Sequence, residues 1–96
     1  MKKIKQEIPD WFYGDIYEKG AEVTNRFGGD SCYLNNIELS IYDFAIGASM
    51  YLEHIPNSVK LSGRMQQKNK DLMQDLIKAL DWFKYNNAEA YMKLLD

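Results

Sequence analysis

The sequence is poor in the residues that most often build catalytic and metal sites. Among its 96 residues it has one cysteine, Cys32, and one histidine, His54. A single cysteine cannot form an internal disulfide, and the N-terminus lacks the apolar run of a signal peptide, so we expect a reducing, cytoplasmic location. One histidine and one cysteine cannot supply the ligands of a structural zinc site, and no calcium-binding loop pattern is present. We therefore expect no metal and no cofactor.

Long apolar runs and a strong net charge are also missing. The most apolar segment, residues 37–55, is interrupted by Glu38, Asp43 and Glu53, so it cannot supply the roughly 20 apolar residues that cross a bilayer. A formal net charge of −2 argues against general nucleic-acid binding, which needs a cationic surface. A chain of 96 residues has room for one core, which predicts a single domain over 1–96. Seven tyrosines, four phenylalanines and two tryptophans exclude disorder over the whole length.

The spacing of the apolar residues predicts an all-α domain of about four helices, two long and two short, with one long irregular loop. A short helix is expected over 10–19, because Pro9 favours a helix start and Gly20 a helix end. A long helix is expected over 36–54, since Asn35 and Glu38 have the spacing of a capping box. Its apolar stripe consists of Ile37, Ile41, Phe44, Ala45, Ala48 and Leu52.

The second half of the chain predicts two further helices. A long one begins near 62–64, and a short one follows Asn86 and Glu89, which repeat the Asn-x-x-Glu capping pattern. The stripe of the long helix consists of Met65, Leu72, Met73, Leu76, Ile77, Leu80 and Phe83. Residues 21–35 lack a sustained period and are predicted to be the loop, with a short extended piece at 22–24.

Two features could bind an anion. In the loop, Gly28, Gly29 and Ser31 could turn backbone N–H groups toward a phosphate while Arg26 supplies a guanidinium, although a plain turn explains the same residues. The second feature lies in residues 54–70, which contain no acidic residue. There Arg64 and Lys68 lie one turn apart near a helix start, although an ordinary solvated basic face is the simpler explanation.

Aromatic side chains could complete such a site. Trp11, Phe27 or Tyr33 could stack on a nucleotide base. Tyrosine and tryptophan are also too numerous for the centre of a small core, which favours an interface with a partner or with further copies of the chain, a homo-oligomer. Partial burial with the hydroxyl groups in water is the alternative.

No combination of residues predicts catalysis. His54 follows Glu53 directly, and neighbouring helix residues point about 100° apart, so the two do not form an acid–base pair. Cys32 has no base at a diagnostic spacing and is expected to be an inert thiol. Five carboxylates could meet across helices, but carboxylates spread over amphipathic helices are more typical of solvated faces. They are Asp15, Glu18, Glu38, Asp43 and Glu53. We expect a protein that is not an enzyme.

Four segments carry a resemblance to a known family. They are residues 8–14 (IPDWFYG), 38–44 (ELSIYDF), 82–83 (WF) and 90–96 (AYMKLLD). Together they resemble a family of small uncharacterised proteins of tailed bacteriophages. Arg26 stands where the resemblance leads us to expect a proline before Phe27. The resemblance implies a viral accessory protein that acts in the cytoplasm of an infected bacterium.

The resulting hypothesis is a non-enzymatic accessory binding protein. As a counter-defence protein it would sequester a nucleotide-like signal or bind a host protein. The alternative is a structural protein of the virion or of its assembly, whose aromatic residues bury against copies of itself.

Overall fold

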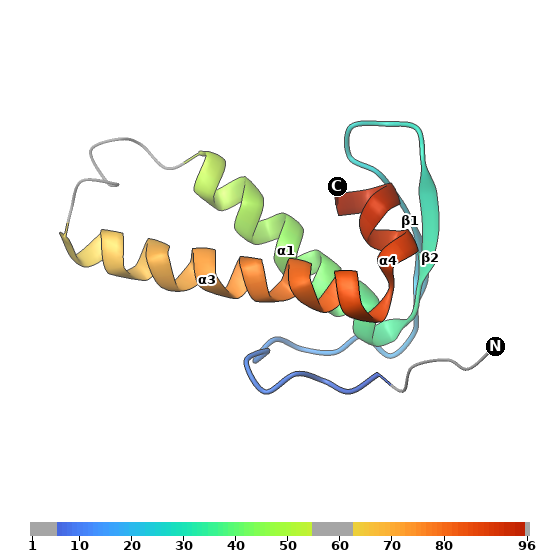
Figure 1. Ribbon diagram of the computed structural model, residues 1–96, viewed down its shortest axis with the longest axis horizontal. Helices are drawn as coiled ribbons and strands as arrows, with labels where there is room; N and C mark the ends of the chain where they lie inside the picture. Colours follow the sequence, from blue (N-terminus) through green and yellow to red (C-terminus); the bar gives the residue numbers. More distant parts are fainter. Residues whose placement is uncertain (1–5, 55–62, 96) are drawn as a thin grey trace.

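The computed structural model describes residues 6–54 and 63–95, and the side chains of residues 63–67 lie outside that description. Its elements follow in the order β1 (Ala21–Thr24), β2 (Ser31–Leu34), α1 (Asn36–Glu53), α3 (Gly63–Asn86), α4 (Ala88–Ala90) and the π-helical turn η1 (Tyr91–Leu95). In Figure 1, α1 and α3 form a long pair, and the β-hairpin stands at one end beside α4. The fold is therefore mixed α and β, and the prediction of an all-α domain with four helices is wrong.

The first correction is a β-hairpin within residues 21–35, where we expected an irregular loop with a short extended piece at 22–24. The extended piece is confirmed as part of β1, whereas the second strand was not predicted. β1 and β2 pair antiparallel, with Ala21 opposite Leu34 and Thr24 opposite Ser31. Leu34 is fully buried, and β2 packs against α4 and η1. Each strand has only 4 residues, so a period of two has no room to become visible in the sequence.

The second correction concerns residues 10–19, where we expected a helix. Pro9 opens a single turn in which its carbonyl accepts a hydrogen bond from the N–H of Phe12 at 3.0 Å, and the chain then continues without a helix to β1. Trp11 and Phe12 pack against the core, so their burial does not require a helical period. Gly20 is not a helix cap: a Cβ there would lie 2.1 Å from the carbonyl oxygen of Leu34. This glycine permits a close approach of two backbone segments.

The prediction for α1 is confirmed, including its cap. The side chain of Asn35 accepts a hydrogen bond from the N–H of Glu38 at 2.8 Å, and the carboxylate of Glu38 accepts one from the N–H of Asn35 at 2.9 Å. These two bonds form a capping box. At the other end, Nδ1 of His54 lies 2.7 Å from the carbonyl oxygen of Met50. Since a carbonyl only accepts, His54 donates to an orphan carbonyl of the last turn.

The core lies where α1 crosses α3. Ile41, Ala45 and Ala48 of α1 are buried together with Ala79 and Phe83 of α3. The small alanine side chains let the two helices approach closely, while Phe83 fills the space beside them. The predicted stripe of α3 is wider than the buried face, because Met73 and Ile77 are about half exposed and Met65 lies outside the described side chains.

The N-cap of the last helix, α4, lies one residue later than predicted. The side chain of Asn87, not Asn86, accepts a hydrogen bond from the N–H of Ala90 at 3.2 Å and caps α4. Asn86 instead donates from its side chain to the carbonyl of Trp82. Residues Ala90 and Leu94 are buried and close the core under the hairpin. No helix in the described ranges has the length and apolarity needed to cross a bilayer.

Candidate functional site

A buried carboxylate holds the N-terminal segment in place. Glu38 is 5% exposed, and its Oε2 accepts hydrogen bonds from the side-chain amides of Gln6 at 2.8 Å and Asn87 at 2.9 Å. Gln6 in turn accepts a hydrogen bond from the side-chain amide of Asn35 at 2.8 Å. The carboxylate therefore joins the N-terminal segment to the caps of both α1 and α4.

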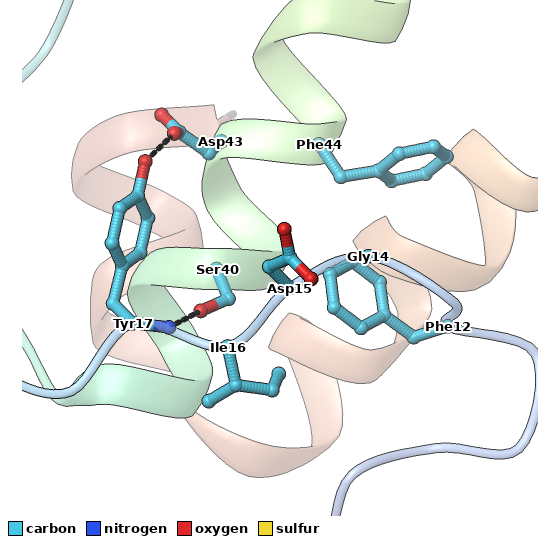
Figure 2. A pocket seen from close by; sticks show the side chains of 8 residues that line it. All are labelled: Phe12, Gly14, Asp15, Ile16, Tyr17, Ser40, Asp43 and Phe44. Carbon is cyan, nitrogen blue, oxygen red and sulfur yellow. Dashed lines mark hydrogen bonds between the residues drawn. The ribbon is translucent and has the colours of Figure 1, made fainter.

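The N-terminal segment and α1 border an open hollow of about 450 Å³, here called the Tyr17 hollow. Figure 2 shows Tyr17 and Asp43 on one side, Phe12 and Phe44 on the other, and Asp15 between them. The hollow is lined by Phe12, Gly14, Asp15, Ile16, Tyr17, Ser40, Asp43 and Phe44. Two carboxylates and three aromatic rings thus surround one space, and among the described residues no lysine or arginine lines it.

Tyr17 is attached to α1 at two points. Its backbone N–H donates to Oγ of Ser40 at 2.9 Å, and Ser40 donates in turn to the carbonyl of Asn36 at 2.7 Å. Its phenol donates to Oδ2 of Asp43 (Figure 2). This hydrogen bond and the negative charge of Asp43 favour the neutral phenol, so they raise the pKa of Tyr17 above its usual value of 10.0.

Aromatic packing forms the other side of the hollow. The ring of Phe44 lies 6.1 Å from that of Phe12 in an edge-to-face arrangement and 6.2 Å from that of Trp11. Trp11 and Phe12 also meet edge to face at 6.0 Å. Offset and edge-to-face pairs are the favoured geometries of aromatic rings. The cluster therefore stabilises the wall on which the hollow depends.

A second hollow of about 400 Å³, the Tyr51 hollow, lies further along α1. It is lined by Phe44, Gly47, Ala48, Tyr51 and Leu72. Its lining is apolar, and Tyr51 and the neighbouring Met50 are about half exposed. Because Phe44 lines both hollows, they form one surface along the helix.

Several residues of the predicted anion site lie together, at the tip of the hairpin. Arg26, Phe27, Gly28 and Gly29 are in the turn 25–30, and Ser31 begins β2. Gly28 and Gly29 have φ of 92° and 98°, conformations that favour glycine. The N–H of Gly28 donates to the carbonyl of Asn25, as in a turn. Arg26 pairs with Glu53 at 3.0 Å, and its guanidinium lies 4.7 Å from the ring centre of Phe27.

The remaining predicted residues are spread over the molecule. Tyr33 is exposed on β2, whereas Trp11 lies in the N-terminal segment against Phe44. Lys68 is exposed in the second turn of α3, which begins at the far end of the molecule from the hairpin (Figure 1). The side chain of Arg64 lies outside the described part of the chain.

The Tyr17 hollow itself was missed by the sequence analysis. Asp15 and Asp43 stood among the carboxylates that could meet, but we interpreted them as solvated. Ser40 and Asp43 lie three positions apart on one helix face, which is a local signal that could have been used. The contact of Tyr17 with Asp43 spans 26 positions and has no local signature.

Cys32 is a free thiol and lines neither the Tyr17 hollow nor the Tyr51 hollow. It is partly buried, and burial, followed by the charge of Glu89, raises the pKa of the Cys32 thiol above 9.0. Thiolate is the reactive form, so this environment disfavours nucleophilic chemistry. Within residues 6–54 and 63–95, no three or more His, Cys, Asp or Glu side chains group as metal ligands.

Comparison with known proteins adds no relative: no family model, no curated protein and no solved structure matches the chain.

Proposed function

We propose that this chain is a non-enzymatic accessory binding protein that engages another protein through the exposed surface along α1. The observation that carries the proposal is the pair of hollows that share Phe44. Exposed tyrosine and methionine beside an apolar hollow are the composition of protein interfaces. Following the phage resemblance, the target would be a host protein in the bacterial cytoplasm.

The exposure of the lining favours a protein over a small molecule. Tyr17, Asp43, Gly47 and Tyr51 are all exposed, so the two hollows are open along the helix. A small-molecule pocket instead buries most of its ligand's surface. A protein segment laid along α1 could contact both hollows at once, and an amphipathic or extended segment is the usual occupant of such a groove.

The test is capture of partners by the tagged full chain from bacterial lysate, quantified by mass spectrometry. Tyr51→Ser removes an aromatic side chain from the Tyr51 hollow. Tyr85→Ser is the matched control, since Tyr85 is exposed on α3 and lines neither hollow. A protein lost with Tyr51→Ser and kept with Tyr85→Ser supports the proposal. An identical set of captured proteins for wild type and both variants overturns it.

Self-association is the alternative that the same surface allows. In a virion or assembly protein, the apolar lining would bury against further copies of the chain. Native mass spectrometry of the purified protein distinguishes self-association from binding of a host protein. A homo-oligomer that dissociates with Tyr51→Ser favours the assembly role, whereas a monomer that captures a host protein favours the accessory role.

Sequestering of a nucleotide-like signal is a second candidate, favoured by the hairpin tip. Phe27 is 84% exposed, so one face of its ring is available to a base while Arg26 lies beside it. A phosphate would have to displace Glu53 from Arg26. Native mass spectrometry of protein isolated from lysate would then retain a nucleotide-sized mass, and Arg26→Ala would lose it. A bare protein in both cases contradicts this candidate.

A further inference from the structure

The Tyr17 hollow carries a negative charge that the described part of the chain does not neutralise. Asp15 and Asp43 both line it and are exposed. Neither carboxylate takes part in the ion pairs Arg26–Glu53, Lys78–Asp75, Lys84–Asp81 and Lys93–Glu89, which form within the described residues. Oδ2 of Asp43 accepts the Tyr17 phenol, and its other oxygen can accept a further donor.

The aromatic part of the lining suits a planar cation. Phe12, Phe44 and Tyr17 contribute aromatic rings to the same space (Figure 2). An aromatic face attracts a cation within about 6 Å, and a guanidinium can also stack on it. The carboxylates and the rings together therefore favour a planar cation as ligand. A phosphate would be repelled by the carboxylates, and a neutral apolar side chain would leave them without a partner.

The arrangement is held before any ligand arrives. Asp43 is fixed on α1 and bonded to Tyr17, whose backbone N–H is held by the buried hydroxyl of Ser40. The ring of Phe12 packs over Gly14, where a Cβ would lie 2.8 Å from the ring. A preorganised site loses less conformational entropy on binding, which favours affinity.

We propose that the Tyr17 hollow receives an arginine side chain from a basic segment of the partner, with the guanidinium between Asp15 and Asp43 and its face on the aromatic wall. This inference rests on the proposed function, because it names the partner chemistry recognised at the same surface. Arginine fits better than lysine, because its planar guanidinium binds a carboxylate through two parallel N–H groups while stacking on a ring.

The experiment titrates the isotope-labelled full chain with a blocked Gly-Arg-Gly peptide, followed by NMR. The matched probe is the same peptide with citrulline, which keeps the shape and removes the charge. The expected result is a set of shifts around residues 14–17 and 40–44, with binding at least about tenfold weaker for citrulline.

Charge variants identify the site. Asp15→Asn and Asp43→Asn should each weaken the arginine peptide several-fold. Glu22→Gln, which removes the same charge from exposed β1, should leave its affinity unchanged. Asp15→Asn serves as the second variant if Asp43→Asn perturbs the fold, because Asp15 makes no hydrogen bond or ion pair with the other described residues.

The outcomes separate this inference from the proposed function. Equal binding of arginine and citrulline peptides, or equal weakening by Glu22→Gln, overturns the arginine site. Captured partners that depend on Tyr51 and not on Asp15 or Asp43 overturn it too, while the proposed function stands. Arginine binding without any captured partner keeps the site and removes the proposed function.

Discussion

The phenol of Tyr17 donates a hydrogen bond to Asp43, a residue 26 positions later in the chain. The N–H of the same tyrosine donates to Ser40, one helical turn before Asp43. One residue of a segment without regular structure is thus bound at two points to a single face of α1. This double attachment defines the shape of the Tyr17 hollow, because Asp15 and Ile16 precede Tyr17 directly.

The raised pKa of Tyr17 predicts a pH dependence of stability above neutrality. A group whose pKa is higher in the folded protein adds stability that is complete below its unfolded pKa, here 10.0, and is lost as the pH rises through the folded value. Urea unfolding of the wild type between pH 8 and 11 should therefore show a falling free energy of unfolding. Tyr17→Phe should fall less steeply over the same range.

Three other groups contribute in the same window and make the comparison between variants necessary. Burial raises the pKa of Cys32 and that of Tyr42, and a hydrogen bond to Glu89 raises the pKa of Lys93. All three remain in Tyr17→Phe, so the difference between the two slopes isolates Tyr17. Asp43→Asn removes the cause of the shift and should also reduce the slope. Parallel profiles for all three proteins would contradict the assignment.

Substitution of the two neighbouring asparagines between α3 and α4 should affect stability unequally. Asn87 caps the helix and also donates to Glu38, whereas Asn86 makes one side-chain bond to Trp82 of its own helix. Loss of an N-cap costs about 1 kcal/mol, and loss of the bond to a charged group adds to it. Asn87→Ala should therefore lower the free energy of unfolding more than Asn86→Ala in chemical denaturation. The reverse order would restore the cap predicted from the sequence.

The long helices were predictable because their signals are local. Asn35 and Glu38 lie in one turn, and the stripe of α1 repeats over 18 residues. The helix predicted over 10–19 is wrong for the same reason. Trp11, Phe12, Ile16 and Tyr17 have a helical spacing, but Trp11 and Tyr17 are held by contacts with α1 that are distant in sequence. Long-range packing overrides a weak local propensity, especially where Gly14 disfavours the helix.

The hairpin and the hollow depend on contacts that no short window contains. β1 and β2 are short, and Gly28 and Gly29 indicated a turn without showing which strands it joins. The hollow arises only when Asp15 is brought to Asp43, which requires the fold of the whole N-terminal segment. Residue types could be assigned from the sequence, whereas their juxtaposition could not.

Substitution by alanine should change the stability in opposite directions at Gly20 and at Gly47. A Cβ at Gly20 would lie 2.1 Å from the backbone carbonyl of Leu34, so Gly20→Ala must displace the N-terminal segment or β2. Overpacking of this kind costs about 1–3 kcal/mol. Gly47 lies inside α1 with nothing within 4 Å of a Cβ, so Gly47→Ala should stabilise the helix by about 1 kcal/mol.

Thermal and urea unfolding of the two alanine variants test this pair. The comparison is internally controlled, because both changes add one methyl group and both reduce the entropy of the unfolded chain. Gly20→Ala should melt below the wild type and Gly47→Ala above it. A stabilised Gly20→Ala would mean that the segment before β1 does not approach Leu34.

The buried carboxylate of Glu38 predicts a large loss of stability in Glu38→Gln, a variant of nearly the same shape. It accepts hydrogen bonds from the N–H of Asn35 and from the side-chain amides of Gln6 and Asn87. Glu38→Gln keeps the shape but replaces one carboxylate oxygen by an NH2 group, which donates and cannot accept, so donors face each other. The amides of Gln6 and Asn87 cannot simply turn over, because their oxygens already accept from Asn35 and Ala90.

Leaving a buried donor unsatisfied costs about 1–3 kcal/mol, and Glu38→Gln should lose that much in urea denaturation at neutral pH. Glu22→Gln makes the same chemical change on an exposed strand and should stay within about 0.5 kcal/mol of the wild type. NMR should show the loss at Gln6 and Asn87 first, since both lose the acceptor at Oε2. If the two variants were equally stable, Glu38 would not join the N-terminal segment to α1 and α4.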